Sequence, residues 1–426
     1  MRTEASVPVV RENFTRRTLI LLAILLIGPC LIVTMALSHP RMSHATNEPF
    51  ASQSGEKSTR QISEGNPGPW GRLQYTHVML DIPDEYVSIP SADQPRVRWF
   101  LQDYNKERVI ELLKSVDISQ AQIDKWLPKT AWKSEINGTW LTPGDDLILA
   151  LGTEARSKIY SILIAFPENA DQMDPIWFRP ETLDKQLNES GLTDSSIKLL
   201  KSLLYRNGST LLLFVDKDAA LRQIPDEREK RLFVKTISRK STLIARLKIY
   251  ADSDAESLAG YWGAGVRHRD VLPLINSLRG LERGRYLDIA YLLPNFIQGR
   301  LYKYPSPPAD SKPLEQDCFW TAMNAFNTKI DDRFSDLKYV RESLFNSYYA
   351  ISQPSQLGDL IFLADSNMQA MHAAVYIADD LVFTKNGFHE TQPWILMHLK
   401  DMVETYAARL PPGKQLEILY RRQKNM

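Results

Sequence analysis

Residues 317–320 read Asp-Cys-Phe-Trp, residues 358–362 read Gly-Asp-Leu-Ile-Phe, and residues 372–380 read His-Ala-Ala-Val-Tyr-Ile-Ala-Asp-Asp. The apolar residues after Cys318 recur at helical spacing: Phe319, Ala322, Met323 and Phe326. We therefore expect Cys318 at the start of a helix whose apolar face is buried. The second stretch predicts a short buried strand, and the third predicts the first strand of a β-hairpin that turns at the two aspartates. This part of the chain is thus expected to be α+β.

Cys318 and His372 carry the reactive side chains of these stretches. Unpaired N–H groups and the positive end of the helix dipole favour a thiolate at a helix start, so we expect a lowered pKa for Cys318. In a strand, His372 shares a face with Ala374 and Tyr376. A lone cysteine beside an apolar helix is more often a small core residue, and a lone strand histidine is usually structural. The residues alone leave both interpretations open.

The order of these pieces resembles the NlpC-type cysteine peptidases, which have a compact papain-like fold. That family shows an Asp-Cys helix start, a Gly-Asp-Leu motif at the beginning of a strand, and a histidine strand followed by an acidic turn. The resemblance covers residues 301–426 and implies an N-terminal helix, carrying the cysteine, packed on an antiparallel sheet. It implies Cys318 as nucleophile, with its backbone N–H helping to hold the oxyanion, and His372 as general base.

The third catalytic residue is less clearly specified. The resemblance implies a polar residue one strand beyond the base, and ungapped matching places Thr384 there. A two-residue hairpin turn would instead put Lys385 on the face of His372, whereas a three-residue loop would put Thr384 and Asn386 there. We take Thr384 as the third residue, with Lys385 and Asn386 as alternatives.

The N-terminal part predicts a membrane segment. Residues 18–37 carry no charge, and about 20 helical residues span a hydrocarbon core of about 30 Å. Arginines outnumber acidic residues in the preceding segment: Arg2, Arg11, Arg16 and Arg17 against Glu4 and Glu12. We therefore expect residues 1–17 to be a cytoplasmic tail and the bulk of the chain to be periplasmic, held by one helix in the inner membrane. The alternative is a signal peptide cleaved near Ala36, which would give a secreted protein.

The remaining chain divides by composition. Residues 38–70 are rich in Ser, Asn, Gly, Pro and charge, which predicts a flexible linker. Residues 71–300 show several helical periodicities and predict a helix-rich mixed domain of unknown role. Within the papain-like domain, residues 301–426, Gln392 and Pro393 are expected to start a helix that continues through Tyr406, and residues 417–420 to form a closing strand.

Composition narrows the function classes. Among 426 residues, 52 Lys and Arg face 51 Asp and Glu, which argues against a nucleic-acid partner because such proteins usually carry a basic stripe. Cys30 and Cys318 are the two cysteines, which rules out a disulfide framework and a cysteine-rich zinc site. We find no cofactor motif and expect neither metal nor cofactor.

We therefore expect a membrane-anchored, extracytoplasmic thiol hydrolase that cleaves amide bonds, with cell-wall peptides as the substrate that the resemblance implies. One alternative is a catalytically silent papain-like domain that binds wall peptides or a partner protein. Another is an acyl- or lipid-directed hydrolase with the same Cys318–His372 dyad. A sulfur close to His372 in an open cleft favours an enzyme, whereas a sulfur sealed in the core favours the silent domain.

Overall fold

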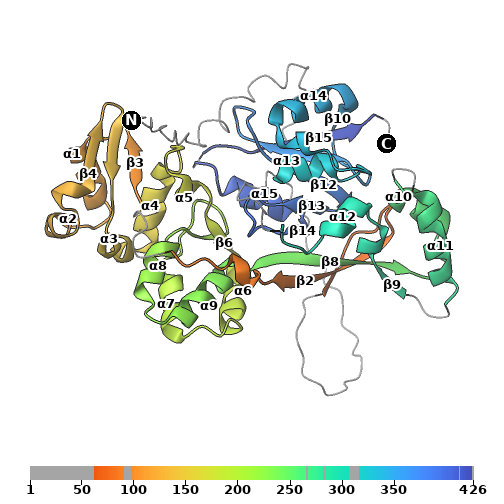
Figure 1. The fold of residues 1–426 in the computed structure, drawn as a ribbon, viewed down its shortest axis with the longest axis horizontal. Helices are drawn as coiled ribbons and strands as arrows, with labels where there is room; N and C mark the ends of the chain where they lie inside the picture. The colour runs from red at the N-terminus through yellow and green to blue at the C-terminus, as the bar shows by residue number, and fades with distance from the viewer. Residues whose placement is uncertain are drawn as a thin grey trace, which may run out of the picture.

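The computed structural model describes residues 62–90, 97–264, 267–281, 285–306, 316–411 and 413–424 (Figure 1). The predicted cytoplasmic tail and the predicted membrane helix, residues 18–37, lie outside these ranges. In the part of the chain that is described, no helix has the length and apolar character needed to cross a bilayer. The fold is α+β, and all its sheets pair antiparallel, as predicted for the C-terminal third.

A six-stranded sheet forms the centre of the C-terminal third. Its strands lie in the order β10 (Tyr348–Ile351), β15 (Glu417–Gln423), β11 (Leu360–Ala364), β12 (Ala370–Ala378), β13 (Leu381–Lys385) and β14 (Trp394–His398). The strands expected near residues 358–362, 372–378, 381–384 and 417–420 are thereby confirmed.

One helix covers each face of this sheet. Helix α13 (Cys318–Asn324) packs against β12 and β13 on the face that carries Phe362, Ala373 and Phe383. Helix α15 (Leu399–Ala407) supplies Met402 and Tyr406 to the other face. Because side chains alternate along a strand, neighbouring residues of β12 and β13 belong to different cores.

The helix expected from Gln392 onward is wrong in its first part. Residues 394–398 form strand β14, paired with β13, and the helix begins only at Leu399. Trp394 and Leu396 enter the α13 core, whereas Ile395 and Met397 enter the α15 core. The period of two over these buried residues decides for a strand, and the helical spacing from Ile395 to Leu399 is a coincidence.

A second sheet packs against the first. Its order is β1 (Ile62–Glu64), β2 (Arg72–Leu80), β8 (Lys240–Ile249) and β9 (Arg285–Asp288). The elements around it are α10 (Ala255–Trp262), α11 (His268–Arg279), η4 (Ile289–Leu292) and α12 (Asn295–Arg300). Figure 1 shows β2 and β8 running from the middle helices toward α10 and α11, beneath the six-stranded sheet.

The two sheets share one core. Leu73 and Trp262 belong to the same buried cluster as Cys318 and Phe383. The Thr242 hydroxyl donates to the Leu396 carbonyl at 2.9 Å and accepts from the Leu396 N–H at 3.1 Å. The domain boundary expected between residues 300 and 301 therefore falls within one continuous hydrophobic core. Residues 62–64, assigned to the linker, pair as β1 with β2.

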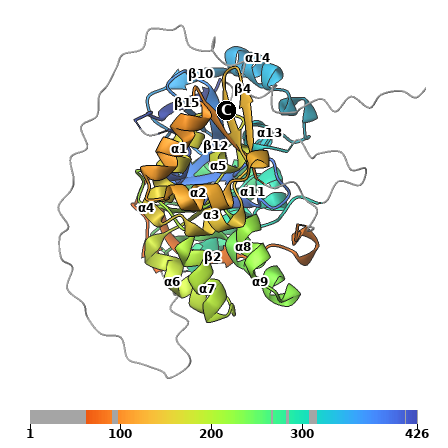
Figure 2. The same cartoon turned by 90° about the vertical axis from the view of Figure 1, so that its left-hand side faces the viewer.

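The middle of the chain is helix-rich, as expected. Its helices are α1 (Lys106–Lys114), α2 (Gln120–Trp126), α3 (Asp145–Ala150), α4 (Thr153–Leu163), α5 (Ala170–Met173), α6 (Pro180–Asn188), α7 (Asp194–Ser202), α8 (Lys217–Gln223) and α9 (Glu227–Ser238). Its strands are β3 (Trp99–Gln102), β4 (Trp132–Glu135), β5 (Gly138–Leu141), β6 (Ile176–Phe178) and β7 (Leu212–Phe214). Figure 2 shows these helices in front of the C-terminal sheet.

Candidate functional site

Cys318 is the first residue of α13, as the sequence predicts. Asp317 caps the helix, its side chain accepting a hydrogen bond of 2.8 Å from the Trp320 N–H. An aspartate suits this position because its oxygen satisfies one of the free N–H groups of the first turn. All seven residues of α13 are buried, so packing as well as the cap holds Cys318 in place.

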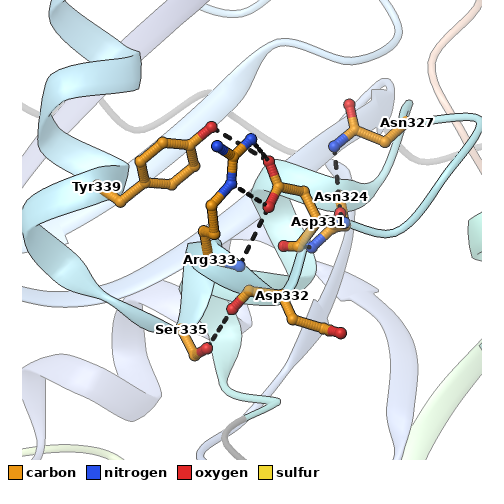
Figure 3. Close-up of polar contacts among 7 residues, drawn as sticks. All are labelled: Asn324, Asn327, Asp331, Asp332, Arg333, Ser335 and Tyr339. Atoms are coloured by element: carbon orange, nitrogen blue, oxygen red, sulfur yellow. Dashed lines mark hydrogen bonds and ion pairs between the residues drawn. The ribbon is translucent and has the colours of Figure 1, made fainter.

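A polar turn fixes the other end of α13 (Figure 3). The amide nitrogen of Asn324 donates to the carbonyl oxygens of Trp320 and Asp331, both at 3.1 Å, and its oxygen accepts from the Asp331 N–H at 2.7 Å. The Asp331 carboxylate in turn accepts from the Arg333 guanidinium at 2.7 Å and from the Tyr339 hydroxyl at 3.1 Å. These bonds tie α13 to the 3₁₀ turn η5 (Asp332–Ser335) and to α14 (Leu337–Ser347).

The Gly-Asp pair before β11 has a structural role. The Asp359 carboxylate accepts from the N–H groups of Ser355 at 2.8 Å and Gln356 at 3.0 Å, and it pairs with the Arg422 guanidinium at 2.7 Å. Gly358 has a φ of 100°, a left-handed conformation that favours glycine. The motif therefore shapes the turn into β11 and anchors β15.

The Cys318 sulfur is enclosed. Cys318 is only 5% exposed. Burial raises the pKa of its thiol well above the ordinary value; the Asp317 carboxylate adds to this, while the N–H groups of Ala373 and Cys318 and the Lys385 ammonium oppose it. The expectation of a lowered pKa is therefore wrong, because desolvation outweighs the dipole of a short helix.

His372 is fully buried and lies beside Thr384. The Thr384 Oγ1 is 2.8 Å from Nε2 of His372, and it donates to the Ala373 carbonyl oxygen at 3.1 Å. A hydroxyl has one hydrogen, so where Thr384 donates it to Ala373, its oxygen accepts from Nε2–H of His372. Nδ1 is buried with no hydrogen-bond partner in the described chain. Burial, and then Arg409, lowers the pKa of His372 well below its ordinary value, so the ring is neutral, and with Nε2 protonated Nδ1 holds a lone pair.

A β-bulge puts Thr384 beside His372. The turn at Asp379 and Asp380 is a two-residue turn, with Ala378 opposite Leu381. The register then shifts between Tyr376 and Ala378, so that Val375 lies opposite Phe383. This extra residue moves Thr384 to the His372 face, where a regular two-residue hairpin would have put Lys385.

Neither alternative to Thr384 makes a hydrogen bond to His372 in the described part of the chain. Lys385 is fully buried, and its ammonium donates to the carbonyl oxygens of Gly387 at 2.7 Å and His389 at 3.0 Å. Burial lowers the pKa of Lys385 to about 8, while Cys318 and Asp317 oppose this shift. The Asn386 amide nitrogen contacts the Met397 sulfur at 3.6 Å, and its oxygen is buried with no partner among the residues described.

Cys318 and His372 lie on opposite faces of the six-stranded sheet. Cys318 shares the α13 core with Ala373, whereas the side chain of His372, one residue earlier in β12, lies on the α15 face with Ala374 and Tyr376. In the described structure no hydrogen bond joins them, yet the sulfur faces the N–H of Ala373, the residue that follows His372. The His372 ring stacks on the Tyr406 ring, with centroids 4.2 Å apart. Burial raises the pKa of the Tyr406 phenol; Arg409 opposes the shift and Cys318 adds to it. Tyr406 therefore belongs to the site, although the sequence analysis treated it only as an apolar helix position.

No family model matches this chain, and no similar curated protein or solved structure was found. The site itself is thus the basis for a functional assignment. One face of the sheet has a thiol beside two backbone N–H groups, and the other has a neutral imidazole with an unpartnered Nδ1 beside Thr384. A thiol, a base and fixed N–H donors are the groups that acyl transfer requires.

Proposed function

We propose that this chain is a papain-like thiol hydrolase in which Cys318 is the nucleophile and His372 the general base. The observation that carries the proposal is the buried Nδ1 of His372, which has no hydrogen-bond partner among the described residues. With the Nε2–H of His372 engaged by Thr384, Nδ1 is the atom able to accept a proton. A histidine with a purely structural role would be expected to satisfy both ring nitrogens, because a buried polar atom without a partner is costly.

Before reaction the Cys318 thiol and the His372 imidazole are both neutral. The thiol proton must therefore be transferred while the sulfur attacks the acyl carbon. As the Cys318 sulfur forms its bond to the acyl carbon, the thiol proton passes to Nδ1 of His372, and the carbonyl electron pair moves to oxygen. The N–H of Cys318 stabilises that oxygen. The proton then moves from Nδ1 to the departing amine as the C–N bond breaks, and water hydrolyses the thioester. Cys318 is 5% exposed and packs on the α13 face, whereas His372 stacks on Tyr406 on the α15 face. The site must therefore open and bring the sulfur to Nδ1 of His372 before the attack.

The proposed substrates are amide bonds of cell-wall peptides, cleaved outside the cytoplasm by a protein anchored through residues 18–37. Support for this substrate class comes from the order of the Asp-Cys, Gly-Asp-Leu and His motifs. Support for the location comes from the uncharged N-terminal segment and the arginines before it.

A silent binding domain is the second candidate, and one observation favours it. Cys318 is enclosed, with a raised pKa, and makes no hydrogen bond to His372 within the described residues. A domain that only binds would keep this arrangement permanently.

Turnover of a wall-peptide amide by the full chain separates the two candidates. Cys318→Ala should abolish turnover, and Cys318→Ser should lose nearly as much because serine is far harder to deprotonate. His372→Ala should lower the rate by about 10²–10⁴-fold, the usual effect of removing a general base. Equal rates for the wild type and Cys318→Ala, including no turnover by either, would favour the silent domain.

A further inference from the structure

A cleft of about 720 Å³ lies between β2 and β8, helix α6, and the β14–α15 unit. Strands β2 and β8 contribute His77 and Lys240 to its lining. Arg179, the residue before α6, also lines it, as do His398 of β14 and Asp401 of α15. Its size is that of a small-molecule or short-peptide site. Cys318 is not among its lining residues, so the cleft is distinct from the enclosed sulfur.

Most cations of this cleft already have an anion. Arg179 pairs with Asp401 at 2.8 Å, Arg239 with Asp81 at 2.6 Å, and Arg409 with Asp174 at 2.9 Å. Lys240 differs from these arginines, because its ammonium has no hydrogen bond or ion pair with any described residue. Burial lowers the pKa of Lys240 to about 8; Asp174 opposes that shift and Arg409 adds to it. Lys240 is half-buried at the cleft wall, so its ammonium can pair with an anionic ligand there.

Further polar atoms in the cleft wall lack a hydrogen-bond partner. Nε of Arg409 and Oδ1 of Asn386 are both buried without a hydrogen-bond partner in the described part of the chain, and both residues line the cleft. One is a donor and the other an acceptor. A carboxylate satisfies the first, and a peptide N–H satisfies the second.

A residue of the cleft wall contacts the aromatic ring that stacks on the proposed catalytic base, His372. The Arg409 guanidinium lies over the Tyr406 ring at 4.6 Å, and that ring stacks on His372 at 4.2 Å. Asn386 follows Thr384 by two residues at the end of β13. A ligand held by Arg409 and Asn386 would therefore lie directly behind the His372–Thr384 pair.

We propose that this cleft binds a peptide with a free carboxylate. The carboxylate lies between the Lys240 ammonium and Nε of Arg409, and a peptide N–H donates to Oδ1 of Asn386. Naming the peptide as the substrate rests on the proposed function, whereas its binding does not. The inference thus gives the hydrolase a preference for peptides that carry a free carboxylate.

Titration calorimetry on the full chain tests this with N-acetyl-dialanine as the free acid and as its C-terminal amide. The acid should bind at least about tenfold more tightly, the order of magnitude lost with a charge-assisted pair. Lys240→Met should remove this preference and Lys240→Arg should keep it. The matched control is Lys198→Met, which removes the same charge from exposed α7 outside the cleft. Thermal melting verifies that each variant is folded.

Equal binding of acid and amide, no binding of either, or equal losses in Lys240→Met and Lys198→Met would overturn the proposal. Its failure is separable from that of the proposed function. Acid-selective binding with no Cys318-dependent turnover leaves the cleft proposal standing and removes the hydrolase. If turnover depends on Cys318 but peptide binding does not depend on Lys240, the hydrolase stands and the cleft proposal is removed.

Discussion

The Thr384 hydroxyl lies 2.8 Å from Nε2 of His372 and 3.1 Å from the Ala373 carbonyl oxygen. Thr384 thus orients the ring, but it carries no negative charge to stabilise an imidazolium. A carboxylate at this place would favour the charged ring. With threonine instead, the buried His372 stays neutral and has a lowered pKa.

Replacing Thr384 with valine should test this orienting role. Thr384→Val keeps the shape but leaves Nε2–H without an acceptor, at a cost of about 1–3 kcal/mol in unfolding free energy. Turnover should fall about tenfold, less than for His372→Ala. Nitrogen NMR of the ring should show one tautomer in the wild type and in Thr384→Ser, but a mixture in Thr384→Val. An unchanged single tautomer in the valine variant would contradict the role.

The buried, neutral His372 should make the protein sensitive to acid. The unfolded state binds a proton at the ordinary histidine pKa of 6.5, whereas the folded state does so only at much lower pH. Stability therefore falls as the pH drops below 6.5, by about 1.4 kcal/mol per pH unit from this residue. Urea unfolding at pH 7 and pH 5 should show a loss about 2 kcal/mol smaller in His372→Gln than in the wild type.

The control for this pH effect is His389→Gln, which removes an exposed imidazole. It should keep the wild-type loss between pH 7 and pH 5. If His372→Gln also keeps it, His372 titrates alike in the folded and unfolded protein, and the neutral buried ring is ruled out.

Asp317 should have two separable effects. Its oxygen caps α13, and its charge helps to raise the pKa of Cys318. Asp317→Ala should cost about 1 kcal/mol of stability through the lost cap, whereas Asp317→Asn should cost much less. Asp317→Asn should also speed alkylation of Cys318 at fixed pH, because it removes the negative charge. Wild-type stability of the alanine variant, or a wild-type alkylation rate in the asparagine variant, would each refute the corresponding role.

Local pattern was enough to predict the start of α13 at Cys318 and the strand that carries His372. It was not enough for the third residue. One extra residue in the hairpin near Ile377 decides whether Thr384 or Lys385 faces His372. A bulge of this kind changes the register without changing the alternation on which the strand prediction rests.

Long-range packing was also beyond local pattern. Residues 62–64 read as linker because they are short and polar, yet they pair with β2. Tyr406 fits a helical apolar stripe, and its stacking on His372 depends on α15 crossing the sheet. The burial of Cys318 likewise comes from a core shared with Leu73 and Trp262, more than fifty residues before it.

The most direct test of the Cys318–His372 pair is the pH profile of iodoacetamide alkylation at Cys318. Mass spectrometry would measure the initial rate between pH 6 and pH 9 in the wild type and in His372→Ala. Any opening that exposes the sulfur is common to both proteins, so the shapes of the profiles report on the base. With His372 accepting the thiol proton, the wild-type rate should change less than about threefold between pH 6 and pH 8. In His372→Ala it should rise about tenfold per pH unit, following the thiolate fraction. Parallel profiles that both rise tenfold per unit would show that His372 does not activate Cys318.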